Sequence, residues 1–518
     1  MLSRLKSLPF HPFLLAAYPV IALFANNIGE VSTSVFLRSL AVSLTAAALL
    51  LLAARAGLRS WHRAALLAGL LLIAFFAYGQ VYDLKKSFAF LAAIMRHRFF
   101  APLWLLLFGA LALLVIRARE NRALTPILNA AALVMLVMPL VQIGRYALVT
   151  TREYRSASAE RLPVQALTVP PGKSLPSVYF ILLDTYMRSD ALQRDMNFDN
   201  TAFVRELEEL GFAVPQCSRV NYSYTQASMV TALNMDYLDP LKAELEQNKI
   251  DMGVYALIKW SKVRQALESA GYRTVAFDSG YEWSRIYDAD AYLGLNRDTL
   301  AMQTMSRFEA MLVKSTLLRV YTDYAIRQSQ SGLAQANSPF AEHIELERFI
   351  LTRLPNLAAD PAPKFVFAHV LIPHWPYVFL PDGSIRADPD FNQDDPTPEQ
   401  LRQGYTDSVA FVNREILAAV RRILAESATP PVIVIFGDHG LKADNRLQNF
   451  AAIYLPGAQD AVYATITPAN YFRVIFNQQF AAGYPLLPDL SYDDVDPTDA
   501  QDMRAFPETA PGCPVAQP

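Results

Sequence analysis

The chain has 518 residues, of which 53% are hydrophobic, and its formal net charge is −2. This length exceeds one ordinary domain, and the balanced charge gives no reason to expect a nucleic-acid partner, which would require a basic face. Tandem repeats and low-complexity tracts are absent from the sequence, which excludes solenoids and repeat arrays.

The first 150 residues hold nearly all of the long apolar segments. A helix needs about 20 mostly apolar residues to cross a bilayer core, and we predict five such spans. They occupy residues 10–25, 35–54, 64–81, 99–116 and 126–143. The first is the shortest. Because it has no small-residue cleavage site and four more spans follow, we interpret it as a retained anchor rather than a signal peptide.

The basic residues predict the orientation of these spans. If the N-terminus is cytoplasmic, the loops on that side contain Arg4, Lys6, Arg55, Arg59, Arg63, Arg117, Arg119 and Arg122. The opposite side contains Lys85, Lys86, Arg96 and Arg98, which share one loop. Cytoplasmic loops carry the excess of Lys and Arg. We therefore expect five spans to place everything after residue 150 outside the cytoplasm.

Residues 83–98 form that basic loop, with an apolar middle and basic ends (DLKKSFAFLAAIMRHR). Two interpretations remain open. The segment is either a plain connector or an interfacial helix with its apolar face in lipid. In the second case its cations would contact phosphate headgroups.

The sequence changes character after the last span. Residues 1–148 are the predicted transmembrane domain, and residues 149–173 are polar, then Pro-containing, which predicts a linker. Residues 174–518 alternate short apolar segments with helical patterns, for example at 202–210 and 408–426. The apolar segments lie at 177–184, 273–279, 364–373, 431–438 and 450–457.

These apolar segments are continuous rather than alternating, which is typical of strands buried on both faces. Strands separated by helices indicate βαβ units. The fold class that we predict is therefore an N-terminal polytopic α-helical membrane domain followed by a C-terminal α/β domain. The α/β domain should have a mostly parallel central sheet with helices on both faces.

Two predicted strands end in polar side chains. One ends in Asp184, and another ends in Asp438, which His439 follows directly. In open α/β sheets, ligands bind outside the carboxyl ends of the strands. Carboxylates and an imidazole at that edge suit a hard or borderline divalent cation.

The two cysteines, Cys217 and Cys513, both lie after residue 150. In an exported domain they can form a disulfide. They can equally remain two unpaired thiols, and the sequence leaves both alternatives open.

Four segments, in chain order, resemble the sulfatase-like hydrolases and transferases of the alkaline phosphatase superfamily. They are VYFILLDTYMRSDAL, NYSYTQASMVTALNMDYL, FVFAHVLIPHWPY and VIVIFGDHG. The resemblance covers about residues 177–488. Five spans followed by such a domain are also similar in architecture to lipoteichoic acid synthase and the lipid A phosphoethanolamine transferases.

The resemblance implies one tightly held divalent metal ion, with zinc, manganese, magnesium and calcium all open. By their places in the motifs, its ligands would be Asp184, Thr225, Asp438 and His439. Thr225 would also be the nucleophile. The histidine of the HWPY motif, His374, would contact the substrate and assist the leaving group.

Thr225 also makes sense as a nucleophile from its chemistry, because coordination to a metal ion lowers the pKa of a hydroxyl. It precedes a helical pattern at 226–233, whose free amides could face an anion. The simpler interpretation is that Thr225 only caps this helix. Ser223 and Ser228, in the same segment, compete with it for the role.

Three further residues near the motifs are candidates for substrate binding: His369, Arg188 and Lys442. Each has a simpler interpretation. His369 lies inside a predicted strand, where a histidine is equally often structural, and the two basic residues can be ordinary surface cations.

The absence of two sequence motifs limits the kinds of reaction that the chain can be expected to catalyse. Cys217 is followed by Ser-Arg-Val rather than by the C-x-P-x-R motif of formylglycine sulfatases, so sulfate-ester hydrolysis loses support. The histidines after residue 150 are His343, His369, His374 and His439, and none has an Asp four residues before it. A single metal ion is therefore expected rather than a two-metal phosphatase site.

We expect a membrane-anchored, metal-dependent enzyme that transfers a phospho-substituent through a covalent threonine intermediate. The donor would be a membrane lipid or lipid-linked compound, and the acceptor an envelope lipid or glycan. The alternatives are a membrane-anchored phosphatase or sulfatase-like hydrolase, and a non-catalytic envelope assembly partner. The expected location is a bacterial-type cytoplasmic membrane, crossed several times, with the catalytic domain outside the cytoplasm.

Overall fold

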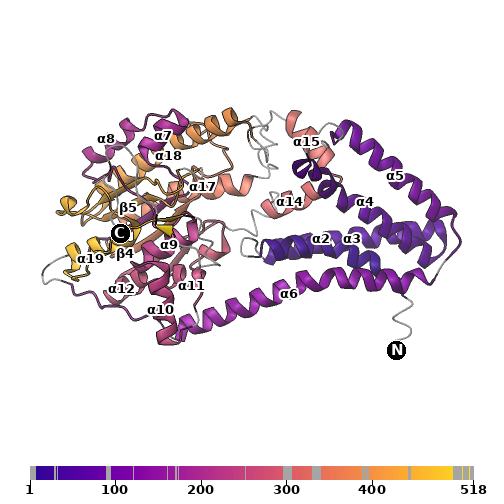
Figure 1. Ribbon diagram of the computed structural model, residues 1–518, viewed down its shortest axis with the longest axis horizontal. Coiled ribbons are helices and arrows are strands. Elements are labelled where there is room, and N and C mark those ends of the chain that lie inside the picture. Colours follow the sequence, from indigo (N-terminus) through magenta and orange to yellow (C-terminus); the bar gives the residue numbers. More distant parts are fainter. Residues whose placement is uncertain are drawn as a thin grey trace. The chain divides into compact units, whose positions relative to one another are not determined.

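The computed structural model, drawn in Figure 1, divides into two compact units. The first unit comprises Met1–Val149 and Asn296–Glu342, and the second comprises Thr150–Leu295 and His343–Pro518. The structure describes residues 8–28, 31, 33–88, 95–120, 122–159, 161–169, 172, 174–250, 252–295, 306–328, 340–387, 391, 396–441, 445–493, 504–505 and 513. Lys442 and residues 89–94 of the basic loop at 83–98 lie outside the described residues.

Long apolar helices form the body of the first unit. They are α3 (Thr33–Leu58), α4 (Trp61–Ser87), α5 (His97–Arg117) and α6 (Leu124–Ala159). All four are long and apolar enough to cross a membrane. The helix that corresponds to the first predicted span, α2 (His11–Asn26), has 16 residues. It would be about 24 Å long, which is less than the ~30 Å core of a bilayer. The predicted spans are therefore confirmed for four helices and not for the first.

Although it is short, α2 packs within the unit. Ala16 and Val20 are fully buried. The carbonyl of Ala16 accepts a hydrogen bond from the Ser43 hydroxyl of α3 at 2.7 Å. At its start, the His11 amide donates to the Asn129 side chain of α6 at 2.9 Å. These contacts hold α2 against its neighbours along its length.

Two shorter helices from a distant part of the sequence complete the first unit. They are α14 (Arg307–Ser315), which opens with a capping box between Ser306 and Glu309, and α15 (Arg319–Gln328). The sequence assigned them to the domain at 174–518. In the structure they pack on the apolar helices, because Glu309 pairs with Arg38 of α3, and Arg319 donates to Asp83 of α4 at 2.8 Å.

The segment predicted as a linker, 149–173, is not all irregular. Helix α6 continues to Ala159, so the beginning of the segment is helical. Residues 161–169 have no regular structure. Leu162 and Leu167 are buried in the hydrophobic core of the second unit, which fixes this part of the chain to the α/β domain.

The second unit is built on a six-stranded sheet with the order β3-β2-β4-β1-β5-β6. The strands are β1 (Val178–Leu183), β2 (Arg273–Phe277), β3 (Ala291–Leu293), β4 (Lys364–Val370), β5 (Val432–Gly437) and β6 (Ala451–Tyr454). All five apolar segments found in the sequence are strands. Only β6 is antiparallel to its neighbour, so the mostly parallel sheet is confirmed.

Helices cover both faces of this sheet (Figure 1). One face carries α9 (Thr225–Asn234), α10 (Leu238–Asn248), α11 (Val254–Lys259), α12 (Lys262–Ser269) and α19 (Pro468–Phe480). The other carries α7 (Ser189–Met196), α8 (Thr201–Glu209), α17 (Ala341–Arg353) and α18 (Pro398–Glu426). Short elements complete the unit: η2 (Glu282–Ser284), η3 (Pro355–Ala359), η5 (Gln459–Ala461), β7 (Tyr492–Asp493) and β8 (Arg504–Ala505).

The central strand β1 explains why the strand segments read as continuously apolar. Phe180 packs against Phe367 and Phe436 on the face covered by α9 and α19. The intervening side chains of β1 are equally buried on the opposite face. Leu183 at the end of β1 lies opposite Gly437 at the end of β5. The residues that follow these two strands therefore meet at one edge of the sheet.

Candidate metal and nucleophile site

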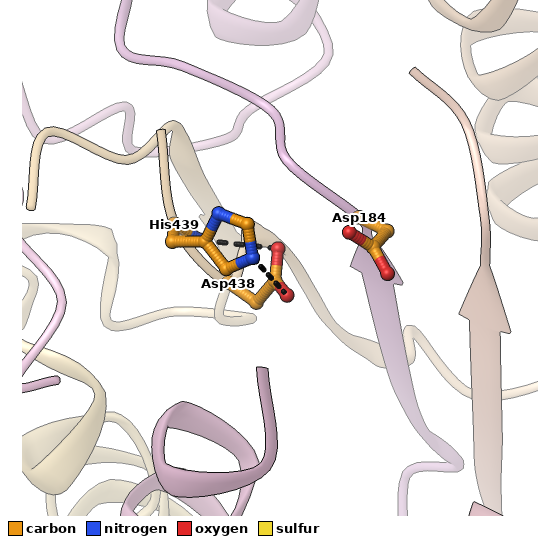
Figure 2. Close-up of side chains that lie close together, drawn as sticks. All are labelled: Asp184, Asp438 and His439. Atoms are coloured by element: carbon orange, nitrogen blue, oxygen red, sulfur yellow. Dashed lines mark hydrogen bonds and ion pairs between the residues drawn. The ribbon is translucent and has the colours of Figure 1, made fainter. Parts of the chain in front are cut away.

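Three of the predicted metal ligands come together at that edge. Asp184 follows β1, and Asp438 and His439 follow β5 (Figure 2). One potential ligand atom from each side chain lies within 4.8 Å of the others. The two carboxylates are buried and the imidazole is half-buried. The register of the sheet therefore brings oxygen and nitrogen atoms that can bind a metal ion close together.

Asp438 has one satisfied and one unsatisfied oxygen. Its Oδ1 accepts hydrogen bonds from the amides of Thr185 at 2.7 Å and of His439 at 3.0 Å. Its Oδ2 is buried without a hydrogen-bond donor in the part of the chain that the structure describes. Burial raises the pKa of the Asp438 carboxyl above its usual range, and the neighbouring Asp184 carboxylate raises it further. A cation at this position would relieve both effects.

The ring of His439 is oriented as a metal ligand would be. Its Nδ1 lies 2.8 Å from the Gly440 carbonyl, which can only accept, so Nδ1 donates. In the neutral ring this leaves the lone pair on Nε2, which lies 3.4 Å from Asp438 Oδ2. A cation between the two atoms would bind both lone pairs. Metal-ligating histidines are commonly fixed in this way, by donation from the other ring nitrogen.

Asp184 lies deeper, against the sheet. His369 of β4, which is fully buried, approaches Asp184 Oδ2 through its Nε2 at 3.2 Å. Burial alone would raise the pKa of Asp184. The charges and hydrogen bonds of His374, His369 and His439 outweigh it and hold that pKa below its usual range. Asp184 is therefore ionised and available as a ligand. The position of His369 next to it is that of a residue that orients the carboxylate.

Thr225 stands beside this cluster. It is the first residue of α9, and the extended Tyr224 occupies the N-cap position. Its hydroxyl lies 3.3 Å from His439 Nε2. The cap position thus belongs to the residue before it, and the hydroxyl faces the candidate ligands instead. Ser223 and Ser228 are both almost fully buried, whereas Thr225 is half-buried.

His374 lies in the loop after β4, where it is half-buried. Its Nδ1 is 2.6 Å from the Trp375 carbonyl and so donates to it. The second ring nitrogen, Nε2, is left as the position at which a proton can be taken up or released. The charge of His374 lowers the pKa of the Asp184 carboxyl. This places the imidazole near the cluster.

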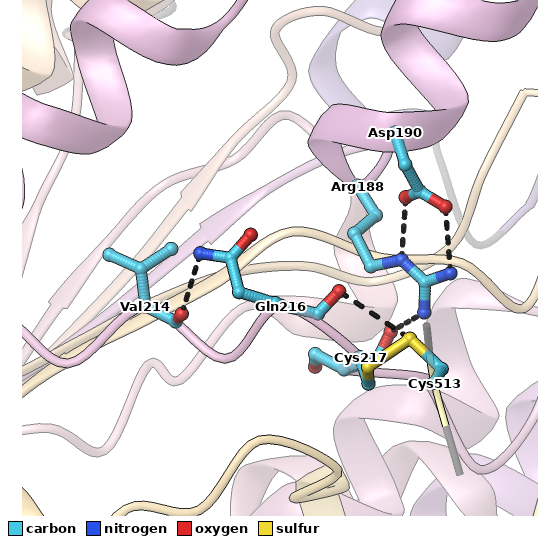
Figure 3. The surroundings of a disulfide bond; sticks show 7 residues. Arg188, Asp190, Val214, Gln216, Cys217 and Cys513 are labelled. Carbon is cyan, nitrogen blue, oxygen red and sulfur yellow. Dashed lines mark hydrogen bonds and ion pairs between the residues drawn. A yellow bond between two sulfur atoms is a disulfide. The ribbon is translucent and has the colours of Figure 1, made fainter. Parts of the chain in front are cut away.

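Arg188 occupies a different environment from the one expected of a substrate-binding cation. Its guanidinium donates to both oxygens of Asp190 and, at 3.0 Å, to the carbonyl of Ser218 (Figure 3). The side chain is buried. Next to it, Cys217 and Cys513 form a disulfide, which resolves the alternative that the sequence left open. A disulfide is typical of an oxidising compartment.

Sequence reasoning did not identify the part played by Thr185. This residue has a φ of 65°, in the left-handed region that threonine rarely adopts. In that conformation its amide donates to Asp438, and its hydroxyl donates to Asp184 Oδ1 at 2.8 Å. One residue therefore positions both carboxylates. An unfavourable backbone conformation of this kind is often found at a functional site, but it leaves no mark in the sequence.

No family model and no curated protein matches the sequence. Solved structures do match. EptA, an integral membrane lipooligosaccharide phosphoethanolamine transferase from Neisseria meningitidis, is 13% identical, with a TM-score of 0.40, over 92% of this chain and 95% of that chain. The C-terminal periplasmic domain of EptC from Escherichia coli, in complex with zinc, is 13% identical, with a TM-score of 0.40, over 66% and 96%.

The lipoteichoic acid synthase LtaP from Listeria monocytogenes is 12% identical, with a TM-score of 0.37, over 64% of this chain and 78% of that chain.

Proposed function

We propose that this chain is a membrane-anchored transferase of the sulfatase-like type, which moves a phospho-substituent through a covalent intermediate on Thr225. The observation that carries the proposal is the position of the Thr225 hydroxyl. It lies 3.3 Å from His439 Nε2, beside two buried carboxylates. A hydroxyl next to a cluster of metal-ligand type is the arrangement that an activated oxygen nucleophile needs.

Asp184, Asp438, His439 and Thr225 would hold one divalent ion in this proposal. The imidazole among the donors favours a borderline cation such as zinc over manganese, magnesium or calcium. The chemistry that a bound ion supplies is a lower pKa for the Thr225 hydroxyl and polarisation of a phosphoryl oxygen. Thr185 and His369 keep the two carboxylates in place through the hydrogen bonds described above.

The protein residues then perform two displacements at phosphorus. The Thr225 oxygen, which has lost its proton before the attack, forms a bond to the phosphorus atom of the donor, and the bond from phosphorus to the donor alcohol breaks. His374 protonates the departing oxygen from Nε2. In the second displacement an acceptor hydroxyl attacks the same phosphorus atom, His374 takes its proton, and the Thr225 oxygen leaves in the deprotonated form in which it began. The amides at the start of α9 would face the phosphoryl group in this proposal.

The substrate class follows from the apolar helices. A domain fixed to a membrane meets donors that diffuse laterally in that membrane, so a phospholipid or lipid-linked donor and an envelope lipid or glycan acceptor are proposed. The site would lie outside the cytoplasm of a bacterial-type cell. This environment also accounts for the disulfide between Cys217 and Cys513.

Intact mass tests the reaction directly. Full-length protein is loaded with zinc, incubated with bacterial phospholipids in nanodiscs, quenched in acid and analysed by mass spectrometry. We expect one covalent addition per chain, located on the peptide that contains Thr225, which an added acceptor then removes. Steady release of the phospho-substituent to water, independent of acceptor, would make the protein a hydrolase. Absence of both an adduct and turnover would favour the non-catalytic assembly partner.

The packing of α14 and α15 supports five passes through the membrane. Phe308 of α14 packs against Phe24 near the end of α2 and Val35 near the start of α3. The following segment contacts α4 at its middle, through Phe75, and near its end, through Asp83, and it contacts α5 at its start, through His97. These are alternating ends of successive helices, so they lie on one side of the bundle. Helix α2 therefore runs through the unit in the same direction as α4.

Reporter fusions test this topology. Alkaline phosphatase fused after residue 165 should be active, and green fluorescent protein at the same position should be dark, because only the first folds outside the cytoplasm. Fusions after Arg119, on the opposite side, serve as the matched control and should give the reverse signals. Fluorescence without phosphatase activity at residue 165 would contradict an exported catalytic domain.

A further inference from the structure

A cavity of about 950 Å³ opens in the first unit where α4, α5 and α15 meet. It is lined by Phe75 of α4, by Arg96, His97 and Arg98 at the start of α5, and by side chains between Leu317 and Asp323. Its volume is at the upper end of the ~300–1,000 Å³ found for small-molecule sites. The cavity does not include any residue of the cluster around Asp184 and Asp438.

The wall formed by α15 is held firmly against α4. The Leu317 amide donates to the carbonyl of Phe75 at 2.8 Å. Gly79 of α4 lies so close to the backbone of Lys314 and Ser315 that a methyl group there would overlap with it. The connection between α14 and α15 is therefore seated on the surface of α4, and the cavity is a built feature of the unit.

The acidic groups at this site are already neutralised by protein partners. Arg319 donates to Asp83 at 2.8 Å and to Asp323 at 3.4 Å. Asp323 also pairs with His97 Nε2 at 2.8 Å. The rings of Tyr82 and His97 stack with their centroids 4.0 Å apart. These contacts fix the inner wall and leave little negative charge to repel an anion.

Arg96 and Arg98, in contrast, are exposed at the rim. Within the part of the chain that the structure describes, neither forms an ion pair with a carboxylate. Arg98 lies over the ring of Phe99, with its guanidinium carbon 4.7 Å from the ring centroid. Arg96 directly precedes the 21-residue helix α5, and Arg98 lies in its first turn. The positive end of the helix dipole adds to the charge of both side chains. The rim of the cavity therefore carries positive charge that can bind an anion.

Apolar side chains continue from this basic rim along the outside of α5. Phe99, Leu103 and Leu106 share one face of the helix and are 54%, 58% and 72% exposed. Leu318 on the opposite wall of the cavity is also exposed. Since α5 is long and apolar enough to cross a membrane, this face would lie in the hydrocarbon layer and the arginines at the level of the headgroups.

We propose that this cavity binds a membrane phospholipid. Its phosphate would be held by Arg96 and Arg98, and its acyl chains would lie along Phe99, Leu103 and Leu106. Charge complementarity selects the phosphate, and the exposed apolar face of α5 selects a lipid over a free anion. The proposal goes beyond the reaction at Thr225 and does not depend on it, because it concerns binding by the first unit alone.

Native mass spectrometry of the full-length protein in detergent tests the site, with palmitoyl-oleoyl phosphatidylglycerol as the probe. The variant Arg96→Gln with Arg98→Gln is compared with Arg117→Gln and Arg119→Gln at the other end of α5, which removes the same charge away from the cavity. An arginine near a charged interface strengthens lipid binding roughly fivefold, so the cavity variant, which lacks two, should bind roughly 25-fold more weakly. The control variant should bind as wild type does.

Each other outcome overturns the proposal. Equal weakening in both double variants would mean a general effect of surface charge, and unchanged binding in the cavity variant would exclude these arginines. Inorganic phosphate that displaces the lipid at equal concentration would make the site one for a free anion, and dioleoylglycerol that binds equally well would remove the role of the phosphate. If the double variant melts at a lower temperature than wild type, the two single variants replace it, each with a roughly fivefold loss.

Discussion

Replacement of Thr225 by alanine is expected to lower turnover about 10⁴-fold or more, because the attacking atom itself is removed. The melting temperature should change little. The N-cap position belongs to Tyr224, and the Thr225 hydroxyl contacts His439 rather than a backbone amide of its own helix. Loss of an N-cap alone would instead cost about 1 kcal/mol of stability and leave turnover largely intact. Initial rates and thermal unfolding, measured on the same preparation, separate the two results.

Three matched variants serve as controls for this experiment. Thr225→Ser keeps an oxygen at the same position and should retain measurable turnover and the covalent adduct. Ser223→Ala and Ser228→Ala remove buried hydroxyls of the same segment and should leave turnover close to wild type. If one of these serine variants were inactive while Thr225→Ala stayed active, the nucleophile would be assigned to the wrong residue of the segment.

The second large effect concerns the metal ion. We expect one divalent ion per chain in protein purified without chelators, and less than about one tenth of an ion in Asp438→Ala with His439→Ala, because two of four ligands are lost. Elemental analysis by mass spectrometry gives the stoichiometry. Asp382→Ala with His343→Ala removes the same residue types from the same domain and should leave the metal content unchanged.

The protonation of Asp438 provides a second readout. Since burial and Asp184 raise the pKa of its carboxyl in the metal-free protein, a proton remains bound to a higher pH than in a free aspartate. Metal binding must displace this proton, so the affinity should fall as the pH is lowered and binding should release acid. Two ions per chain, or an unchanged content in the Asp438 and His439 variant, would contradict the assignment.

The central strands and the three clustered candidate ligands could be predicted from the sequence because a local pattern marks each of them. A strand buried on both faces must be continuously apolar, and the first polar residues after β1 and β5 must emerge at the sheet edge. Asp184 and Asp438 were found in this way. The three-residue, half-buried strand β3 gives no such pattern, and it was missed.

Features that depend on distant partners were not accessible from the sequence. Arg188 beside a site motif resembles a substrate ligand until its pairing with Asp190 and Ser218 is seen. The partner of Cys217 is 296 residues away. The helices α14 and α15 belong to the first unit through Arg38, which pairs with Glu309, and Asp83, which pairs with Arg319. Both partners are more than 200 residues earlier in the chain. Local hydropathy cannot reveal such contacts and assigns the two helices to the domain in which they are encoded.

Because α14 and α15 belong to the first unit, each unit is built from two separate segments of the chain, and the chain crosses between the units three times. The chain enters the α/β unit after Val149, returns to the helical unit at Asn296, and leaves it again after Glu342. A single proteolytic cut between residues 161 and 169 would sever only one of the three covalent connections. The released C-terminal fragment would still contain Glu309 and Arg319, whose partners Arg38 and Asp83 remain on the N-terminal fragment. An enzyme cut in this way stays attached to its membrane helices, and a soluble form requires removal of residues 296–342 as well.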